Sequence, residues 1–151
     1  MTAYNIGDQL DSFERAITLT DMVAYAGATW DWHRMHYDTK YTDEAGLGGP
    51  VVDGQVFGAL FVELLQNSFG PNAFVHTLDF TFRNLMFAGE VLRVAGSVRS
   101  VVDNMVGVDL AATILASEFG PERASTGSAG ALVLLGVIDA SAVDGPGGSE
   151  R

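Results

Sequence analysis

The sequence predicts an α+β fold, in which an antiparallel sheet wraps around one long buried helix. Two observations lead to this prediction. Residues 53–70 have helical spacing and are apolar around most of the circumference, so neighbouring structure must cover the helix on most sides. From residue 74 to residue 137 the chain contains only strand-like segments. A buried helix followed by a run of antiparallel strands indicates a curled sheet around that helix.

The central helix has clear predicted ends. Asp53 is a favourable N-cap, and Gly70-Pro71 is a stop signal. Val52 and Phe57 occupy the two hydrophobic staple positions around that cap. The apolar stripe, widened by Ala59 and Val62, consists of Val56, Phe57, Leu60, Phe61, Leu64 and Leu65.

The remaining elements follow from alternation and turn signals. Residues 13–19 alternate between apolar and polar side chains, which predicts a first strand. We expect Thr20 to N-cap a short helix that runs to about Ala28, with Asp21 in its first turn. Asp103-Asn104 suits a two-residue hairpin turn. The later strands are predicted at residues 74–83, 91–102, 106–115 and 124–137.

Composition limits the classes of protein to consider. The 151 residues suit one domain, predicted at 1–138, and the small polar residues of 139–151 predict a disordered tail. A net charge of −11 disfavours nucleic-acid binding. No apolar run reaches the roughly 18 residues of a membrane span, and no secretory signal is visible, so we expect a cytoplasmic protein without membrane contact. The absence of Cys excludes disulfides and thiolate chemistry.

The densest group of functional side chains lies in residues 30–38, WDWHRMHYD. On a helix, Asp31 and His36 would point about 140° apart, whereas in a curved loop they can converge on one water molecule. One interpretation is general acid–base catalysis by this pair. A second is a metal site, although the spacing of Asp31, His33, His36 and Asp38 is no recognised zinc pattern. The third is that these side chains only hydrogen-bond the backbone.

Three segments of the chain resemble consecutive motifs of one known family. Residues 26–38 resemble the pattern A-x-x-S-G-D-x-N-P-I-H-x-D, with Asp31, His36 and Asp38 on its Asp, His and second Asp. Residues 48–55 correspond to F-G-x-x-V-x-H-G-M, and residues 82–90 to F-x-x-P-V-x-x-G-D. These three motifs, in this order, resemble the MaoC-like hydratase/dehydratase family, which includes the (R)-specific enoyl-CoA hydratases, and the resemblance spans roughly residues 5–137. It implies the hot-dog fold, which is the arrangement that periodicity predicts.

The chain departs from these motifs at three places. His33-Arg34 replaces the Asn-Pro pair, Asp53 replaces the motif histidine, and Leu85 replaces the proline. An H-R-x-H-Y-D variant is familiar in a branch that resembles mitochondrial-type 3-hydroxyacyl thioester dehydratases and mesaconyl-CoA hydratases. The resemblance therefore indicates the type of reaction rather than the substrate.

The resemblance implies addition of water to a 2-enoyl-CoA thioester, or its removal from the 3-hydroxyacyl form, without a cofactor or metal. Asp31 and His36 would be the acid–base pair, and the amide of Gly54 would bind the thioester oxygen. Arg83, Arg93 and Arg99 are candidate contacts for CoA phosphates, or ordinary arginines of a solvated strand face. The residues expected to contact substrate are Trp30, Trp32, Arg34, Val52, Asp53, Gln55 and Phe57.

Two alternatives remain. A hot-dog acyl-CoA thioesterase would use one carboxylate near the central helix, for which Asp53 or Glu63 could serve. A non-catalytic, thioester-binding subunit of a MaoC-like heteromer is the other, although both Asp31 and His36 are present. Residues 132–135 are apolar on both faces of their strand, which predicts a homodimer or larger homo-oligomer with sites between protomers.

Overall fold

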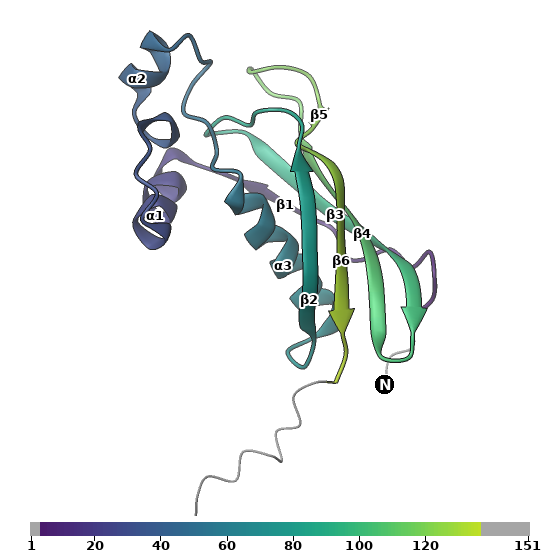
Figure 1. Cartoon of the computed structure of the whole chain (residues 1–151). Helices are drawn as coiled ribbons and strands as arrows, with labels where there is room; N and C mark the ends of the chain where they lie inside the picture. Colours follow the sequence, from purple (N-terminus) through teal and green to yellow (C-terminus); the bar gives the residue numbers. More distant parts are fainter. Residues whose placement is uncertain (1–3, 137–151) are drawn as a thin grey trace, which may run out of the picture.

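A computed structural model describes residues 4–136 and contains one antiparallel sheet with helix α3 against one of its faces (Figure 1). The sheet order is β1-β3-β4-β6-β2, and β5 pairs with β4 beside this path. The predicted α+β architecture is confirmed. The strands are β1 (Phe13–Ala16), β2 (Phe74–Phe82), β3 (Val91–Val102), β4 (Met105–Ile114), β5 (Arg123–Ala124) and β6 (Thr126–Leu134). The helices are α1 (Leu19–Thr29), the 3-10 turn η1 (Arg34–His36), α2 (Thr39–Glu44) and α3 (Gln55–Phe69).

Helix α3 is the centre of the hydrophobic core. All six residues of its predicted apolar stripe are buried, and the side chains of β3, β4 and β6 that meet them are buried as well. Its N-cap is Gly54 rather than Asp53. The Asp53 carboxylate nevertheless accepts a hydrogen bond from the Gln55 amide at 2.9 Å. Asp53, the residue before the N-cap, thus satisfies one of the free amides in the first turn of α3.

The predicted start of α1 was wrong by two residues. Thr18, not Thr20, is the N-cap, and the predicted first strand ends at Ala16. Thr18 and Asp21 form a reciprocal capping box: the Thr18 hydroxyl accepts from the Asp21 amide, and the Asp21 carboxylate accepts from the Thr18 amide at 2.8 Å. Thr20 has no acidic residue three positions later, so it cannot form such a box.

The predicted hairpin turn is confirmed. Asp103 and Asn104 connect β3 to β4, and Asp103 adopts the left-handed conformation that such turns require, with φ of 54°. The last predicted strand is divided into β5 and β6 at Ser125, whose backbone bonds to both Ala112 and Arg83. The predicted tail at 139–151 lies outside the described residues. Between residues 4 and 136, no helix is long and apolar enough to cross a membrane.

Candidate active site

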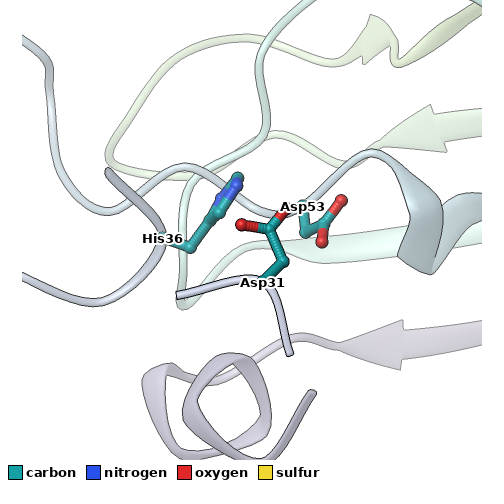
Figure 2. A group of neighbouring side chains, drawn as sticks. All are labelled: Asp31, His36 and Asp53. Carbon is teal, nitrogen blue, oxygen red and sulfur yellow. The ribbon is translucent and has the colours of Figure 1, made fainter. Parts of the chain in front are cut away.

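Asp31, His36 and Asp53 converge at one end of α3, as Figure 2 shows. One oxygen or nitrogen atom from each side chain lies within 4.8 Å of the others. The three residues come from separate places: the loop after α1, the turn η1 and the segment before α3. The sequence motif pairs Asp31 with His36, and the structure adds Asp53 to that pair.

The end of α1 sets the position of Asp31. Trp30 is the C-cap and adopts a left-handed conformation with φ of 62°, which turns the chain away from the helix axis. Asp31 follows directly and accepts a hydrogen bond from the His33 amide at 3.1 Å. The segment 30–38 is therefore a loop with one 3-10 turn, the irregular shape that lets residues five apart face one another.

The ring of His36 is fixed in one orientation. Its Nδ1 lies 2.7 Å from the carbonyl oxygen of Val51, and a carbonyl can only accept, so Nδ1 carries the proton. In a neutral imidazole, Nε2 then holds a lone pair, the form that a general base requires. The Val51 amide donates in turn to the Met35 carbonyl at 2.9 Å, which joins η1 to the segment before α3.

Asp53 is the most buried member of the group, with 6% of its surface exposed. Its backbone segment is held by distant residues: the Val52 amide donates to Met86 at 2.8 Å, and the Ala88 amide donates to Pro50 at 2.8 Å. The Asp53 carboxylate also interacts electrostatically with Tyr25 of α1. Burial raises the pKa of the Tyr25 hydroxyl, and the Asp53 carboxylate adds to that effect.

A buried ion pair supports the segment that holds Asp53. The Glu90 side chain is fully buried and accepts from Arg123 at 2.6 Å, Ser117 at 2.7 Å and the Phe87 amide at 2.9 Å. Burial alone would raise the pKa of Glu90, but these hydrogen bonds outweigh it and the pKa is lowered. Glu90 thereby fixes the turn that carries Met86 and Ala88. No spacing or motif in the sequence indicates this role of Glu90.

A cavity of about 430 Å³ opens at the N-terminus of α3, and Asp53 is the member of the group of three that lines it. It is lined by Met35, Val51, Val52, Asp53, Gly54, Gln55, Phe57, Phe82, Arg83, Asn84, Leu85 and Met86. Four of the residues predicted to contact substrate are in this lining, together with Gly54. Three are not: Trp30 is 80% exposed, Trp32 stacks edge-on against it, and Arg34 forms an ion pair with Asp38 at 2.8 Å.

The ring of Phe82 lies over Gly54 at the start of α3. A Cβ atom at position 54 would overlap the far end of that ring, and the Phe82 side chain, which is 65% exposed, would have to move aside. The first amides of a helix have no intrahelical acceptor, and the helix dipole makes this end electropositive. The Gly54 amide lies at that end, on the wall of the cavity. In the sequence, Phe82 stands out only as the first residue of the motif at 82–90, and its contact with position 54 is not predicted.

The other charged candidates are engaged elsewhere. The Asp38 carboxylate caps α2 through the Tyr41 amide and binds Arg34, and these contacts lower its pKa. His33 accepts from the Met35 amide, so His33 and Asp38 do not join the group of three. Arg93 pairs with Glu14 at 2.9 Å, Arg99 with Asp109 at 3.0 Å, and Glu63 with Arg15 at 2.6 Å. Arg83 is the one arginine in the cavity lining.

Comparison with known proteins relates the chain to one family. Residues 2–116 match the family model described as "MaoC like domain". A mitochondrial 3-hydroxyacyl-[acyl-carrier-protein] dehydratase of Arabidopsis thaliana is 26% identical over 100 residues, which cover 66% of this chain and 58% of the relative. The match thus spans little more than half of that protein.

Solved structures agree on the fold. The (R)-hydratase from A. caviae involved in PHA biosynthesis superposes with a TM-score of 0.79 at 16% identity, covering 89% of this chain and 99% of that one. A chain of the ChsH1-ChsH2 complex from Mycobacterium tuberculosis gives 0.77 at 19% identity, with coverages of 89% and 99%. The fold is the hot-dog fold, as the sequence resemblance implied.

Proposed function

Because the chain belongs to the MaoC-like domain family, we propose that it is a hydro-lyase that hydrates a 2-enoyl-CoA thioester or dehydrates the 3-hydroxyacyl form. The observation that supports this best is the convergence of Asp31 and His36, with the Nε2 lone pair of His36 left free, beside the electropositive end of α3. Acid–base groups and a site for negative charge are thereby adjacent.

In the hydration direction, a water molecule lies between Asp31 and His36. The pair removes one proton from the water as its oxygen bonds to C3 of the enoyl group. The electrons of the C2–C3 double bond move toward the thioester, so that its carbonyl oxygen gains negative charge. The proton is then delivered to C2, and the pair returns to its starting state. Dehydration follows the same steps in reverse.

The Gly54 amide donates a hydrogen bond to the thioester oxygen in this proposal. Charge on that oxygen is largest in the enolate-like transition state, so a fixed donor stabilises the transition state more than the substrate. The dipole of the fifteen-residue helix α3 acts in the same direction. Arg83 is the basic residue available to a phosphate group of CoA from the cavity wall.

Thioester hydrolysis is the second candidate, and the burial of Asp53 in the cavity wall is the observation in its favour. Glu63 is the weaker carboxylate for that reaction, because it is paired with Arg15 and does not line the same cavity. Crotonyl-CoA distinguishes the two reactions: hydration removes the enoyl-thioester absorbance without releasing a thiol, whereas hydrolysis removes that absorbance and releases one equivalent of free thiol. Loss of absorbance that is matched by an equal release of thiol would overturn the hydratase proposal.

We also propose a homodimer with β2 at the interface. Strand β2 is an edge of the sheet, and Phe74 and Phe82 at its two ends are 54% and 65% exposed. Edge strands with exposed apolar side chains are suited to pairing with another chain. Residues 132–134, which are apolar on both faces of their strand, form the end of β6, and β6 lies inside the sheet next to β2. A dimer mass in light scattering is the expected result, and a monomer with full activity on dilution would contradict it.

Purification with and without a co-expressed homologous subunit tests the remaining alternative, a non-catalytic partner in a heteromer. Activity of the isolated chain on crotonyl-CoA excludes that role. Full dependence on a second subunit that carries its own Asp/His pair would support it.

A further inference from the structure

The group of three at the end of α3 brings one imidazole and two carboxylates together, and these are donor types that zinc-like cations use. In Figure 2 the Asp31 carboxylate lies between the side chains of His36 and Asp53. One ligand atom from each residue lies within 4.8 Å of the others. Three protein ligands, with a fourth position left to water, are the usual composition of an open zinc site.

The two carboxylates of the group have no basic partner. Among residues 4–136, no ion pair involves Asp31 or Asp53. Asp53 is only 6% exposed, and buried charges in proteins are normally paired or coordinate a metal. The basic residues that form ion pairs in this range have other partners, and they are Arg15, Arg34, Lys40, Arg93, Arg99 and Arg123. The positive charge that this group calls for is therefore not supplied by those side chains.

The donor atoms of His36 and Asp53 are held in place by backbone groups outside the cluster. His36 donates through Nδ1 to the Val51 carbonyl, so the lone pair of Nε2 is free. Metal-bound histidines almost always donate their other ring nitrogen to a carbonyl or carboxylate in this way. One oxygen of the Asp53 carboxylate accepts from the Gln55 amide, and the other accepts no hydrogen bond from residues 4–136. Both side chains thus keep one donor atom free while a second atom fixes their orientation.

We propose that Asp31, His36 and Asp53 bind one divalent cation of the zinc class. Zinc lies about 2.0–2.2 Å from nitrogen and oxygen ligands, which places the ligand atoms of a tetrahedral site about 3.4 Å apart. The group has to contract from its present separations of up to 4.8 Å, and Asp31, half-exposed in its loop, can supply most of that movement. The imidazole favours Zn²⁺ over Mg²⁺ and Ca²⁺, which prefer oxygen ligands alone.

Binding of the cation has a consequence for catalysis. Zinc takes up the Nε2 lone pair of His36 and an oxygen of Asp31, and the proposed hydration needs both groups to move protons. The cation and the reacting water therefore exclude each other, and we expect Zn²⁺ to inhibit hydration reversibly. This consequence rests on the proposed function, whereas the binding of the cation does not.

Titration calorimetry of the full chain without an added tag tests the binding. The chain has no Cys, so thiolates cannot contribute. We expect one Zn²⁺ per chain and far weaker binding of Mg²⁺. Asp53→Asn keeps an oxygen that can accept from the Gln55 amide but removes the charged ligand. It should weaken Zn²⁺ binding by about 100-fold or more, since losing only an outer-shell partner already costs 10–100-fold.

His33→Asn is the matched control. His33 belongs to the same loop but not to the group of three, and asparagine can replace it as the side-chain cap of η1. This variant should bind Zn²⁺ as the parent does, and circular dichroism should show that both variants keep the parent fold. If Asp53→Asn does not fold, Asp31→Asn takes its place with the same expected loss.

The same proteins are then assayed with crotonyl-CoA at increasing Zn²⁺, each relative to its own rate without metal. The inhibition constant of the parent should equal the calorimetric dissociation constant, and EDTA should restore the rate. No Zn²⁺ binding by the parent, equal binding by the Asp53 variant, loss of binding in His33→Asn, or binding without inhibition would each overturn the proposal. A parent protein that binds Zn²⁺ as expected but turns over no enoyl-CoA would support the metal site and overturn the proposed function.

Discussion

The two halves of the candidate site are held in different ways. The loop that carries Asp31 and His36 is stabilised mainly by hydrogen bonds between near neighbours, such as His33 to Asp31 and Met35 to His33. The segment that carries Asp53 and Gly54 is bonded to residues far away in the sequence, through Val52 to Met86 and Ala88 to Pro50. The bonds between Val51 and η1 join the halves. We therefore expect changes in the first half to affect catalysis, and changes in the supports of the second to affect stability.

The largest expected effect lies in the first half. Asp31→Asn or His36→Ala should lower kcat on an enoyl-CoA by at least about 100-fold, the usual consequence of losing a general acid or base. Both variants should fold. Asp31→Asn should change the melting temperature little, because Asp31 is half-exposed in an irregular loop, whereas His36→Ala also removes the hydrogen bond to the Val51 carbonyl and should lower the melting temperature moderately. Steady-state kinetics and thermal unfolding on the same samples check this. Near-normal turnover by either variant would remove that residue from the proposed mechanism.

Gly54→Val should affect both catalysis and stability, since position 54 lies in the half that is bonded to distant residues and its amide is the proposed donor to the thioester oxygen. A branched side chain would overlap Phe82 and crowd the thioester, and we expect kcat/KM to fall by about 100-fold, comparable to the loss of one oxyanion donor. The double variant Gly54→Ala, Phe82→Ala has room for the added methyl group and separates the two causes. A folded Gly54→Val protein with full kcat/KM would contradict the assignment of the amide.

Glu90→Gln should act on stability. Removing one charge from a buried ion pair costs about 3 kcal/mol, so the free energy of unfolding at neutral pH should fall by that order. Because the folded-state pKa of Glu90 is lowered, its contribution is complete above the ordinary value of 4.5 and is lost as the pH falls through the lower, folded-state value. Chemical denaturation across acidic pH should therefore show a smaller pH dependence in the variant than in the parent. An equal dependence in both would exclude this role.

The smallest expected effect is at the start of α1, outside both halves. Thr18→Ala should lower the free energy of unfolding by about 1 kcal/mol, the usual value for a lost N-cap. Thr20→Ala is the control, since Thr20 lies inside the first turn and has no capping role in this structure. Equal losses in the two variants would show that the capping box contributes nothing specific.

The elements that the sequence predicted well are those whose signals are local. The apolar stripe of α3 and the alternation of β3 and β4 repeat within one element, and the hairpin turn depends on two adjacent residues. The start of α1 was misplaced because Thr18 and Thr20 are both good caps, and only the partner Asp21 selects between them. Helix α2, six residues long, was missed because it is too short for a periodic pattern.

The site was predicted in part for a related reason. Asp31 and His36 share one loop and one motif, so the sequence could pair them. The approach of Asp53 to that pair depends on how α3 and the turn of Met86 are placed, and the overlap of Phe82 with position 54 depends on β2. Such proximity between segments leaves no periodic or spacing signal. The burial of Glu90 is a further example, because its partner Arg123 is 33 residues away.

The hydrogen bond between His36 and Val51 has a consequence for how the site tolerates mutation. The acceptor is a main-chain carbonyl, so no change of the side chain at position 51 can remove it. The protonated nitrogen of His36 is thus determined by the path of the backbone and not by the identity of a neighbouring residue. Homologous proteins can therefore carry different buried side chains at position 51 and still present the Nε2 lone pair of the histidine to a substrate.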